Sequence, residues 1–387
     1  MRTLAVLGAA PAFPAGLPIT RPAIPSLDRV VPRMEAAFAS GMLTNGANVR
    51  ELEAAAASRL GVRHVVAVSC CTAGLMLATK ALSPKGDAVL PSFTFSASGH
   101  ALAWNGLGLR FGECDLSTFQ ADADDLAGRL EGAGLLCATH VFGAPCDVEA
   151  LEAVAGVAGV PLLLDAAHAF GATRRGRPVG GSGDVEVFSM SPTKVVVAGE
   201  GGLVATNRDD IAESVRIGRD YGNPGDYDTR FVGLNARMSE LHAAVALESL
   251  ADLDENLALR AAVAERYRAG LEDVAGIACQ VLGDGDTSTY KDFTITVEPA
   301  AFGASRDQLR RALSADGIDT RCYFDPPLHR QKAYASVVNG PLPGTDELAS
   351  RVLSLPVYPS LRLGDVDAVV EVIAAAQAAG PAIMALP

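Results

Sequence analysis

The chain has 387 residues, of which 49% are hydrophobic and 20% are charged, and its formal net charge is −13. This length is sufficient for two hydrophobic cores. Because nucleic-acid affinity depends on neutralising phosphates with Lys and Arg, the acidic balance argues against a nucleic-acid partner. A local basic pocket for an anionic small molecule remains compatible with this charge.

The amino-terminal run MRTLAVLGAAPAF contains one Arg and a short apolar stretch that Pro11 and Pro14 interrupt, which makes a poor signal peptide. No apolar stretch approaches the roughly 20 residues needed to span a bilayer. The seven cysteines form no CxxC pair and no cluster with His at metal-ligand spacing, so we expect no metal site. Scattered thiols of this kind are typical of a reducing compartment. We therefore expect a cytoplasmic protein without membrane association.

Short β-rich runs alternate with helical patterns between residues 60 and 210. The predicted strands cover 64–69, 88–91, 109–114, 134–140, 161–165, 185–189 and 202–206. The predicted helices between them cover 72–82, 97–105, 123–131 and 147–158. Several strands are almost continuously apolar, as expected for strands buried on both faces. This alternation predicts an α/β layer with a mostly parallel seven-stranded sheet, in which ligands bind beyond the carboxyl ends of the strands.

A long helical pattern at 239–271 follows, with a break expected near 252–255. We interpret it as the bridge between two domains. After it, the pattern predicts a strand at 290–297 and helices at 305–315 and 365–378. The expected organisation is a large domain at 1–254 and a smaller α+β domain at 255–387.

Asp165 ends the apolar run PLLLD and is followed by His168 and, further along, by Lys194 in SMSPTK. A carboxylate buried at a strand end is costly without a positive partner. The protonated pyridine nitrogen of pyridoxal 5′-phosphate (PLP) is such a partner, because this pairing keeps the cofactor acting as an electron sink. Alternatively, Asp165 caps a helix formed by AAHAFG. The sequence on both sides of Lys194, VFSMSPTKVVVAGEGG, is apolar. This indicates a buried lysine with a function rather than a solvated surface lysine.

The stretch DAAHAFGATRRGRPVGGSGDVEVFSMSPTKVVVAGEGGLVATN closely resembles the DegT/StrS family of sugar aminotransferases. The resemblance runs from about Leu17 through Val372. Further matching segments, in chain order, are SGMLTNGANVRELE, VAVSCCTAGLMLATKAL, PSFTFSASGHAL, GLNARMSELHAAVAL, PPLHRQKAY and LPVYPSL. The resemblance implies PLP fold type I, which is like aspartate aminotransferase, and an activity on nucleotide-linked keto sugars.

The resemblance also implies which residues bind the cofactor. Lys194 matches the lysine that holds PLP as a Schiff base, and Asp165 matches the partner of the pyridine nitrogen. Thr72 and Ala73 match residues that bind the phosphate at the start of a helix, where N–H groups and the helix dipole favour an anion. Ser189 matches a hydroxyl on the same phosphate.

The resemblance implies two further cofactor contacts, and each of these residues could have a structural role instead. Phe95 matches an aromatic ring stacked on the pyridine, although it could be a core aromatic and exchange roles with Phe93. His168 lies where the family has Gln or His near the phenolic oxygen of the cofactor, although a lone His is often structural.

Other matching residues imply a shared active site and substrate contacts. Asn235 lies in a segment that, in relatives, crosses a dimer interface and reaches the phosphate of the neighbouring subunit's cofactor, which implies a homodimer. Arg237 is a candidate for binding an anionic group, such as the carboxylate of a glutamate donor. Tyr323 and His329 match a region near the substrate pocket.

The sequence departs from the family pattern at Cys70-Cys71-Thr72, where relatives often have Ser-Gly-Thr or Asn-Gly-Thr. Gly eases a turn with positive φ, so Cys at this position predicts a turn that does not require it. We expect these thiols to pack rather than to react.

The resemblance implies a reaction that moves an amino group from L-glutamate to a dTDP-linked 4-keto-6-deoxy sugar, with amination at C4. Segments such as LPITRPAIPS, GMLTNGANVRELE and KDF resemble C4 aminases more than C3 aminases. C3 amination of a 3-keto sugar and amination of a cyclitol ketone are the alternatives. Related PLP-dependent dehydratases have His in place of the lysine, so Lys194 argues against that activity. A non-catalytic PLP- or sugar-binding regulator is the alternative from another class. A nicotinamide-dependent enzyme would need G-x-G-x-x-G, which SCCTAG does not supply.

Overall fold

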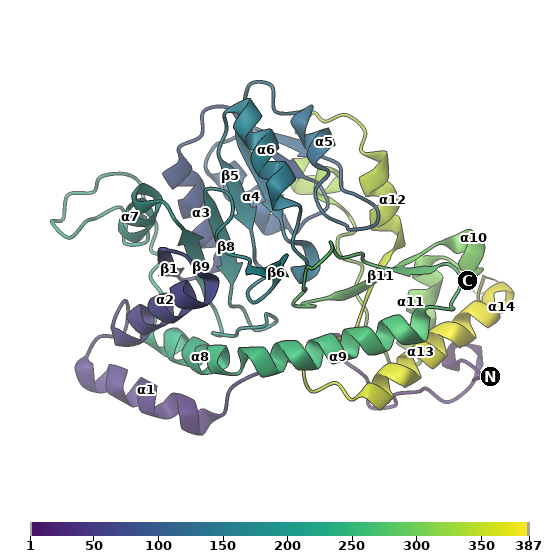
Figure 1. Ribbon diagram of the computed structural model, residues 1–387. Helices are drawn as coiled ribbons and strands as arrows, with labels where there is room; N and C mark the ends of the chain where they lie inside the picture. Colours follow the sequence, from purple (N-terminus) through teal and green to yellow (C-terminus); the bar gives the residue numbers. More distant parts are fainter. Residues whose placement is uncertain (1, 385–387) are drawn as a thin grey trace.

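A seven-stranded sheet forms the centre of the computed structural model, which describes residues 2–384 (Figure 1). Its strand order is β1-β9-β8-β5-β4-β2-β3. Only β9 runs antiparallel to its neighbours within this sheet, and the remaining pairings are parallel. The strands are β1 (His64–Val68), β2 (Asp87–Pro91), β3 (Leu109–Gly112), β4 (Ala133–Thr139), β5 (Leu162–Asp165), β8 (Val185–Ser189) and β9 (Gly202–Thr206). The predicted α/β fold with a mostly parallel seven-stranded sheet is confirmed.

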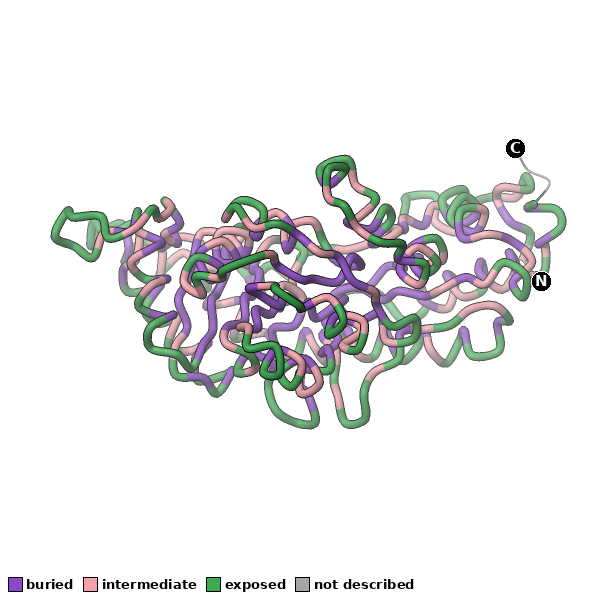
Figure 2. The backbone as a smooth tube through the Cα atoms, turned by 90° about the horizontal axis from the view of Figure 1, so that it is seen from above, coloured by how far each residue is buried: buried purple, intermediate pink, exposed green. Residues whose placement is uncertain are grey.

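Helices cover both faces of this sheet because its strands alternate apolar side chains between two cores. In β5, Leu163 packs in a cluster with α3, α4 and α7, whereas Leu162 and Leu164 pack with α5 and α6. The purple backbone at the centre of Figure 2 shows how completely these strands are buried. These helices are α3 (Cys71–Leu82), α4 (Ser96–Trp104), α5 (Ala123–Ala127), α6 (Val148–Ala158) and α7 (Asp209–Gly218).

Helix α5 is shorter than the predicted 123–131, because it ends before Gly128, a residue with low helix propensity. Two helices near the amino terminus, α1 (Leu27–Ser40) and α2 (Ala47–Leu60), were not predicted. Helix α2 packs on α8 and β1. Its sequence, ANVRELEAAAASRL, is rich in Ala, so its apolar stripe is weak.

The predicted long helix is two helices, α8 (Glu240–Ala251) and α9 (Leu253–Leu271), which meet at Asp252 as expected. Together they run beneath the large sheet toward a second, three-stranded sheet (Figure 1). That sheet contains β10 (Ile277–Cys279), β11 (Phe293–Val297) and β12 (Val352–Leu355), all antiparallel. The predicted boundary between 254 and 255 falls in the first turn of α9 and stays a prediction.

The second sheet has its own core with α9, α11 (Arg306–Ala315) and α13 (Leu363–Ala378). Leu4 and Leu17 pack in this core, so the first residues of the chain associate with the carboxyl-terminal part rather than with the large sheet. The remaining short elements are η1 (Ala5–Leu7), η2 (Val141–Gly143), β6 (Thr173–Arg174), β7 (Arg177–Pro178), α10 (Pro299–Phe302), η3 (Leu328–Arg330), η4 (Lys332–Tyr334), α12 (Pro343–Arg351) and α14 (Gly380–Met384).

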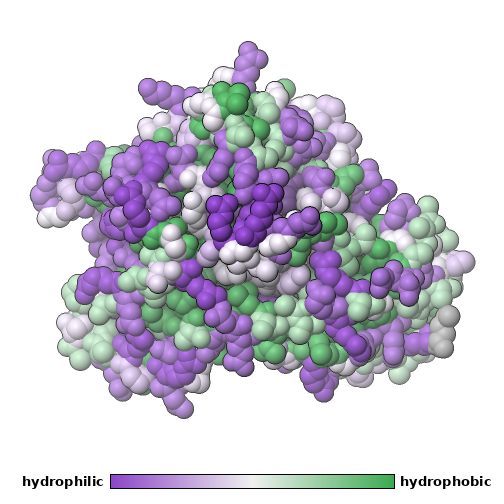
Figure 3. All heavy atoms as spheres, in the orientation of Figure 1, coloured by the Kyte–Doolittle hydropathy of each residue, from purple (hydrophilic) through white to green (hydrophobic). Residues whose placement is uncertain are grey.

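The surface is mixed in character. On the face shown in Figure 3, hydrophobic side chains show between hydrophilic ones along the lower part of the molecule, where α8 and α9 lie. Within residues 2–384, no helix combines the length and the apolar content that a membrane crossing requires.

Glu240, at the start of α8, caps the amino terminus of α2. Its carboxylate accepts hydrogen bonds from the backbone N–H groups of Gly46 at 2.7 Å, Asn48 at 2.8 Å and Val49 at 3.0 Å. The first N–H groups of a helix have no partner within the helix, and a negative charge there is favourable. Because Glu240 is only 1% exposed, water cannot replace it.

We expect Glu240→Ala to lower the free energy of unfolding by about 3 kcal/mol, because it leaves buried N–H donors without partners. Urea denaturation followed by circular dichroism measures this change. Glu51→Ala is the matched control, since the ion pair of Glu51 with Arg33 is exposed and such pairs contribute about 1 kcal/mol or less. Equal effects of the two substitutions would contradict the capping role.

Candidate active site

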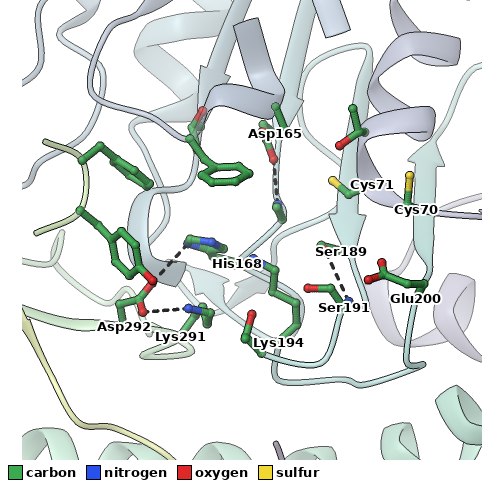
Figure 4. Close-up of a pocket in the computed structure, with 18 residues that line it drawn as sticks. Cys70, Cys71, Asp165, His168, Ser189, Ser191, Lys194, Glu200, Lys291 and Asp292 are labelled. Carbon is green, nitrogen blue, oxygen red and sulfur yellow. Dashed lines mark hydrogen bonds and ion pairs between the residues drawn. The ribbon is translucent and has the colours of Figure 1, made fainter. Parts of the chain in front are cut away.

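A cavity of about 340 Å³ opens beyond the carboxyl ends of β4, β5 and β8 (Figure 4). Parallel strands bring their last residues to one edge of a sheet, so Thr139, Asp165 and Ser189 all line it. Its size is within the range of about 300–1,000 Å³ that is usual for small-molecule sites. The predicted site residues that line it are Thr72, Phe95, Asp165, His168, Ser189, Lys194 and Tyr323.

Asp165 is the buried carboxylate of this cavity, with 3% of its surface exposed. Its Oδ2 accepts a hydrogen bond from Oγ of Ser98 at 2.6 Å, and its Oδ1 accepts one from the N–H of Ala167 at 3.0 Å. Burial raises the pKa of Asp165, and these two hydrogen bonds oppose that shift. Residues 166–171 form turns rather than a helix, so the alternative role of Asp165 as a helix cap is wrong.

Lys194 lies in the loop after β8 and faces Asp165 and His168 across the cavity (Figure 4). The four residues that follow it, 195–198, are buried. Burial and the positive charge of Lys291 lower the pKa of Lys194 to about 8, against the opposing effects of Asp292, Cys71 and Asp165. A lysine with this pKa has a much larger uncharged fraction near neutral pH than an exposed surface lysine, although most of it is still charged.

The start of α3 forms one end of the cavity. Cys71, which stands where relatives often have Gly, is the first residue of this helix and does not have a positive φ, so the turn does not require one. Cys70 is the N-cap of the helix. Thr72 lines the cavity, but Ala73 does not, and the N–H of Ala73 donates to Sγ of Cys70 at 3.4 Å. The backbone at position 202 passes so close to the start of α3 that only Gly fits, because a Cβ there would lie 2.7 Å from the backbone N of Cys71.

Hydroxyl groups gather at this end of the cavity. Ser189 and Ser191 lie near Cys70 there, as does Glu200 (Figure 4), and the hydroxyl residues Thr72 and Thr193 also line the cavity. Several hydroxyl donors next to the amino terminus of a helix make a site that favours an anion such as a phosphate.

The two candidate aromatic residues differ sharply in environment. Phe95 is 57% exposed and lines the cavity, whereas Phe93 is fully buried. The ring of Phe93 packs edge-on against Phe119, Phe142 and Phe324. The possible exchange of roles is therefore excluded, since only Phe95 faces the cavity.

A buried ion pair that the sequence analysis missed also lines the cavity. Nζ of Lys291 lies 2.8 Å from Oδ1 of Asp292, and Nδ1 of His168 lies 4.0 Å from Oδ2 of Asp292 (Figure 4). Burial and the charges of Lys194 and Lys291 hold the pKa of His168 well below its usual range, so its imidazole is neutral. The sequence does contain a sign of this ion pair, because two charged residues, Lys291 and Asp292, directly precede the apolar strand FTITV.

Three other predicted residues lie outside this cavity. Asn235 is exposed, and its Oδ1 accepts a hydrogen bond from Nη2 of Arg237 at 3.3 Å. Arg237 pairs with Asp220 at 2.9 Å and lies over the ring of Tyr221. Their roles in a partner subunit stay predictions.

His329 is held between Ser92, which directly follows β2, and Asp346 of α12. Its Nδ1 lies 2.7 Å from Oγ of Ser92, and its Nε2 lies 3.1 Å from Oδ1 of Asp346. Both ring nitrogens therefore face protein groups, and His329 does not line the cavity, unlike Tyr323.

Comparisons with known proteins show which enzymes this chain is similar to. The chain is 30% identical over 362 residues to dTDP-4-amino-4,6-dideoxy-D-glucose transaminase of Shigella dysenteriae, covering 92% of this chain and 97% of the relative. It is 34% identical over 330 residues to dTDP-3-amino-3,4,6-trideoxy-alpha-D-glucose transaminase of Streptomyces venezuelae, covering 83% of this chain and 85% of the relative. The crystal structure of DesI in the presence of its TDP-sugar product matches with a TM-score of 0.94 and 35% identity, covering 99% of this chain and 98% of that one.

This structural similarity confirms the predicted fold type, and the named relatives confirm the predicted enzyme class, a sugar transaminase. A family model matches residues 28–374, which is nearly the whole chain. The chain therefore belongs to the DegT/DnrJ/EryC1/StrS aminotransferase family.

Proposed function

We propose that this chain binds PLP through Lys194 and moves an amino group from L-glutamate to a nucleotide-linked keto-6-deoxy sugar. The observation that carries the proposal is that one cavity brings together hydroxyl residues next to the start of α3, a lysine and, facing that lysine, a buried carboxylate (Figure 4). PLP carries its aldehyde and its pyridine nitrogen on opposite sides of the ring, and its phosphate arm is next to the aldehyde, so each of these groups has a matching partner in the cavity. The donor set therefore fits the cofactor.

Each residue has a distinct part in this proposal. Thr72, Ser189 and the start of α3 hold the phosphate, Phe95 covers the ring, and Asp165 keeps the pyridine nitrogen charged. His168, as a neutral imidazole, contacts the phenolic oxygen. The bound cofactor supplies an electron sink for the carbanion that forms when the donor loses its Cα proton. Lys194 moves that proton as a general base and acid, for which a pKa of about 8 is well suited.

The acceptor is proposed from the named relatives. Both transaminases above act, by their names, on dTDP-linked amino sugars, so a dTDP sugar is the proposed acceptor. We favour amination at C4, in line with the Shigella relative. C3 amination is the second candidate, because the Streptomyces relative carries its amino group there.

The proposed active unit is a homodimer. Asn235 and Arg237 lie outside the cavity of their own chain, on the segment that follows α7. In the proposed dimer, Asn235 reaches the phosphate in the neighbouring subunit and Arg237 reaches the carboxylate of the donor.

We expect Lys194→Ala to abolish transamination and to remove the absorbance band of the lysine-bound cofactor, because the other lysine of the cavity, Lys291, is held in an ion pair with Asp292. Absorbance spectra before and after addition of L-glutamate measure this effect. The wild-type protein should be yellow and change its spectrum with glutamate. Unchanged thermal unfolding of the variant is the control for its fold, and a wild-type protein that takes up no PLP would contradict the proposal.

The uptake of PLP by the apoprotein should depend on pH through Lys194. Only the uncharged amine attacks the aldehyde, so the uptake rate should rise with pH around the pKa of about 8 rather than around the ordinary 10.5. Lys291→Met removes a neighbouring positive charge and leaves Asp292 unpaired, and both effects raise the pKa of Lys194. The rise should therefore move to higher pH, as measured by stopped-flow absorbance. Lys80→Met, which changes an exposed lysine on α3, should leave the profile unchanged, whereas a Lys291→Met profile like that of wild type would refute the role of Lys291.

Incubation with glutamate and a dTDP-4-keto-6-deoxy sugar should give an amino sugar aminated at C4, identified by mass spectrometry and NMR. A dTDP-3-keto-6-deoxy sugar offered in parallel should remain unconverted. Amination of the 3-keto sugar alone would contradict amination at C4 and would support amination at C3.

A further inference from the structure

A chain of buried hydroxyl groups connects Thr139 to the carboxylate of Asp165, and both of these residues line the cavity. Oγ1 of Thr139 lies 2.8 Å from Oγ1 of Thr94, which lies 3.1 Å from Oγ of Ser98. Ser98 in turn donates to Oδ2 of Asp165 at 2.6 Å. All four side chains are buried, and Thr139 lines the cavity at the far end of this chain of hydroxyl groups.

The direction of each hydrogen bond follows from the number of protons available. An ionised carboxylate only accepts, and a hydroxyl has one proton to donate. Ser98 therefore gives its proton to Asp165 and accepts from Thr94, which in turn accepts from Thr139. The 2.6 Å contact between Ser98 and Asp165 has the length of a bond to a charged oxygen, about 2.5–2.7 Å, whereas the other two have neutral lengths.

Successive hydrogen bonds of one direction polarise each other and strengthen the last one. Here the last bond ends on Oδ2 of Asp165, while the N–H of Ala167 holds Oδ1. These two hydrogen bonds therefore fix the orientation of the carboxylate and also favour its charged form. Thr94 and Ser98 come from the segment PSFTFSAS, which also supplies Phe95.

We propose that Ser98, Thr94 and Thr139 are positioning residues that act as one hydrogen-bonded relay, which holds Asp165 ionised and turned toward the ring nitrogen of the cofactor. This inference rests on the proposed function, because it concerns the same carboxylate. In this inference, the hydrogen bonds of three neutral residues offset part of the free-energy cost of burying the charge of Asp165.

Other titratable groups act on Asp165 as well. Lys194 and His140 favour its charged form, whereas the thiols of Cys71 and Cys137 lie near it and their ionisation would disfavour that form. Burial raises the pKa of both thiols well above their usual range, so they are uncharged. The relay hydrogen bonds and the cationic groups therefore act in the same direction.

The test uses the holoenzyme with PLP labelled with ¹⁵N in its ring. In wild type, the ¹⁵N chemical shift should report a protonated ring nitrogen. In Ser98→Ala, the proton should move toward Asp165 and the signal toward the neutral form. The dissociation constant of PLP should rise about tenfold, as expected for the loss of one hydrogen bond to a charged group.

Thr94 gives a matched pair of variants. Thr94→Val removes the hydroxyl at nearly constant shape and should move the ¹⁵N signal in the same direction as Ser98→Ala, by a smaller amount. Thr94→Ser keeps the hydroxyl and should restore the wild-type signal. If Ser98→Ala fails to fold, this pair carries the test.

A remote buried hydroxyl serves as the control. Oγ1 of Thr294 in β11 lies 2.8 Å from Oγ of Ser354, and both are buried. Thr294→Val should lower stability without changing the ¹⁵N signal. Wild-type ¹⁵N shifts in both Ser98→Ala and Thr94→Val would overturn the relay while leaving the proposed function intact, whereas a wild-type protein without PLP binding would overturn the proposed function itself.

Discussion

Keeping one carboxylate charged in the interior is the constraint on which the rest of this site depends. Asp165 lies at the end of a central strand with 3% of its surface exposed, where an isolated charge is strongly unfavourable. Hydrogen bonds from Ser98 and Ala167 and the positive charge of Lys194 offset that cost. In the proposed holoenzyme the pyridine nitrogen becomes the partner that faces this carboxylate.

The topology of the sheet brings these groups together from distant parts of the sequence. Parallel strands β4, β5 and β8 end at one edge and deliver Thr139, Asp165 and Ser189. The antiparallel strand β9 returns the chain past the start of α3, where Gly202 allows close contact with Cys71. The cavity therefore needs side chains from several elements, none of which forms the site alone.

The sequence predicted most of the large sheet because its strands are short apolar runs bounded by turns, and all seven were found within two residues of their predicted ends. It could not separate Phe93 from Phe95, since both are aromatic and only the packing of the core distinguishes them. It missed Lys291 and Asp292, because their approach to Lys194 depends on how the carboxyl-terminal part folds against the sheet. His329 matched a family segment, but its imidazole is engaged by Ser92 and Asp346.

Lys194 and Lys291 line the same cavity, so the central claim requires that the cofactor be attached to one and not the other. The most direct measurement is reduction of the PLP-loaded protein with borohydride, followed by proteolysis and mass spectrometry of the peptides. The account predicts a pyridoxyl-phosphate mass on the peptide that contains Lys194 and an unmodified Lys291. Modification at Lys291, or no modified lysine in a protein that has been given PLP, would contradict it.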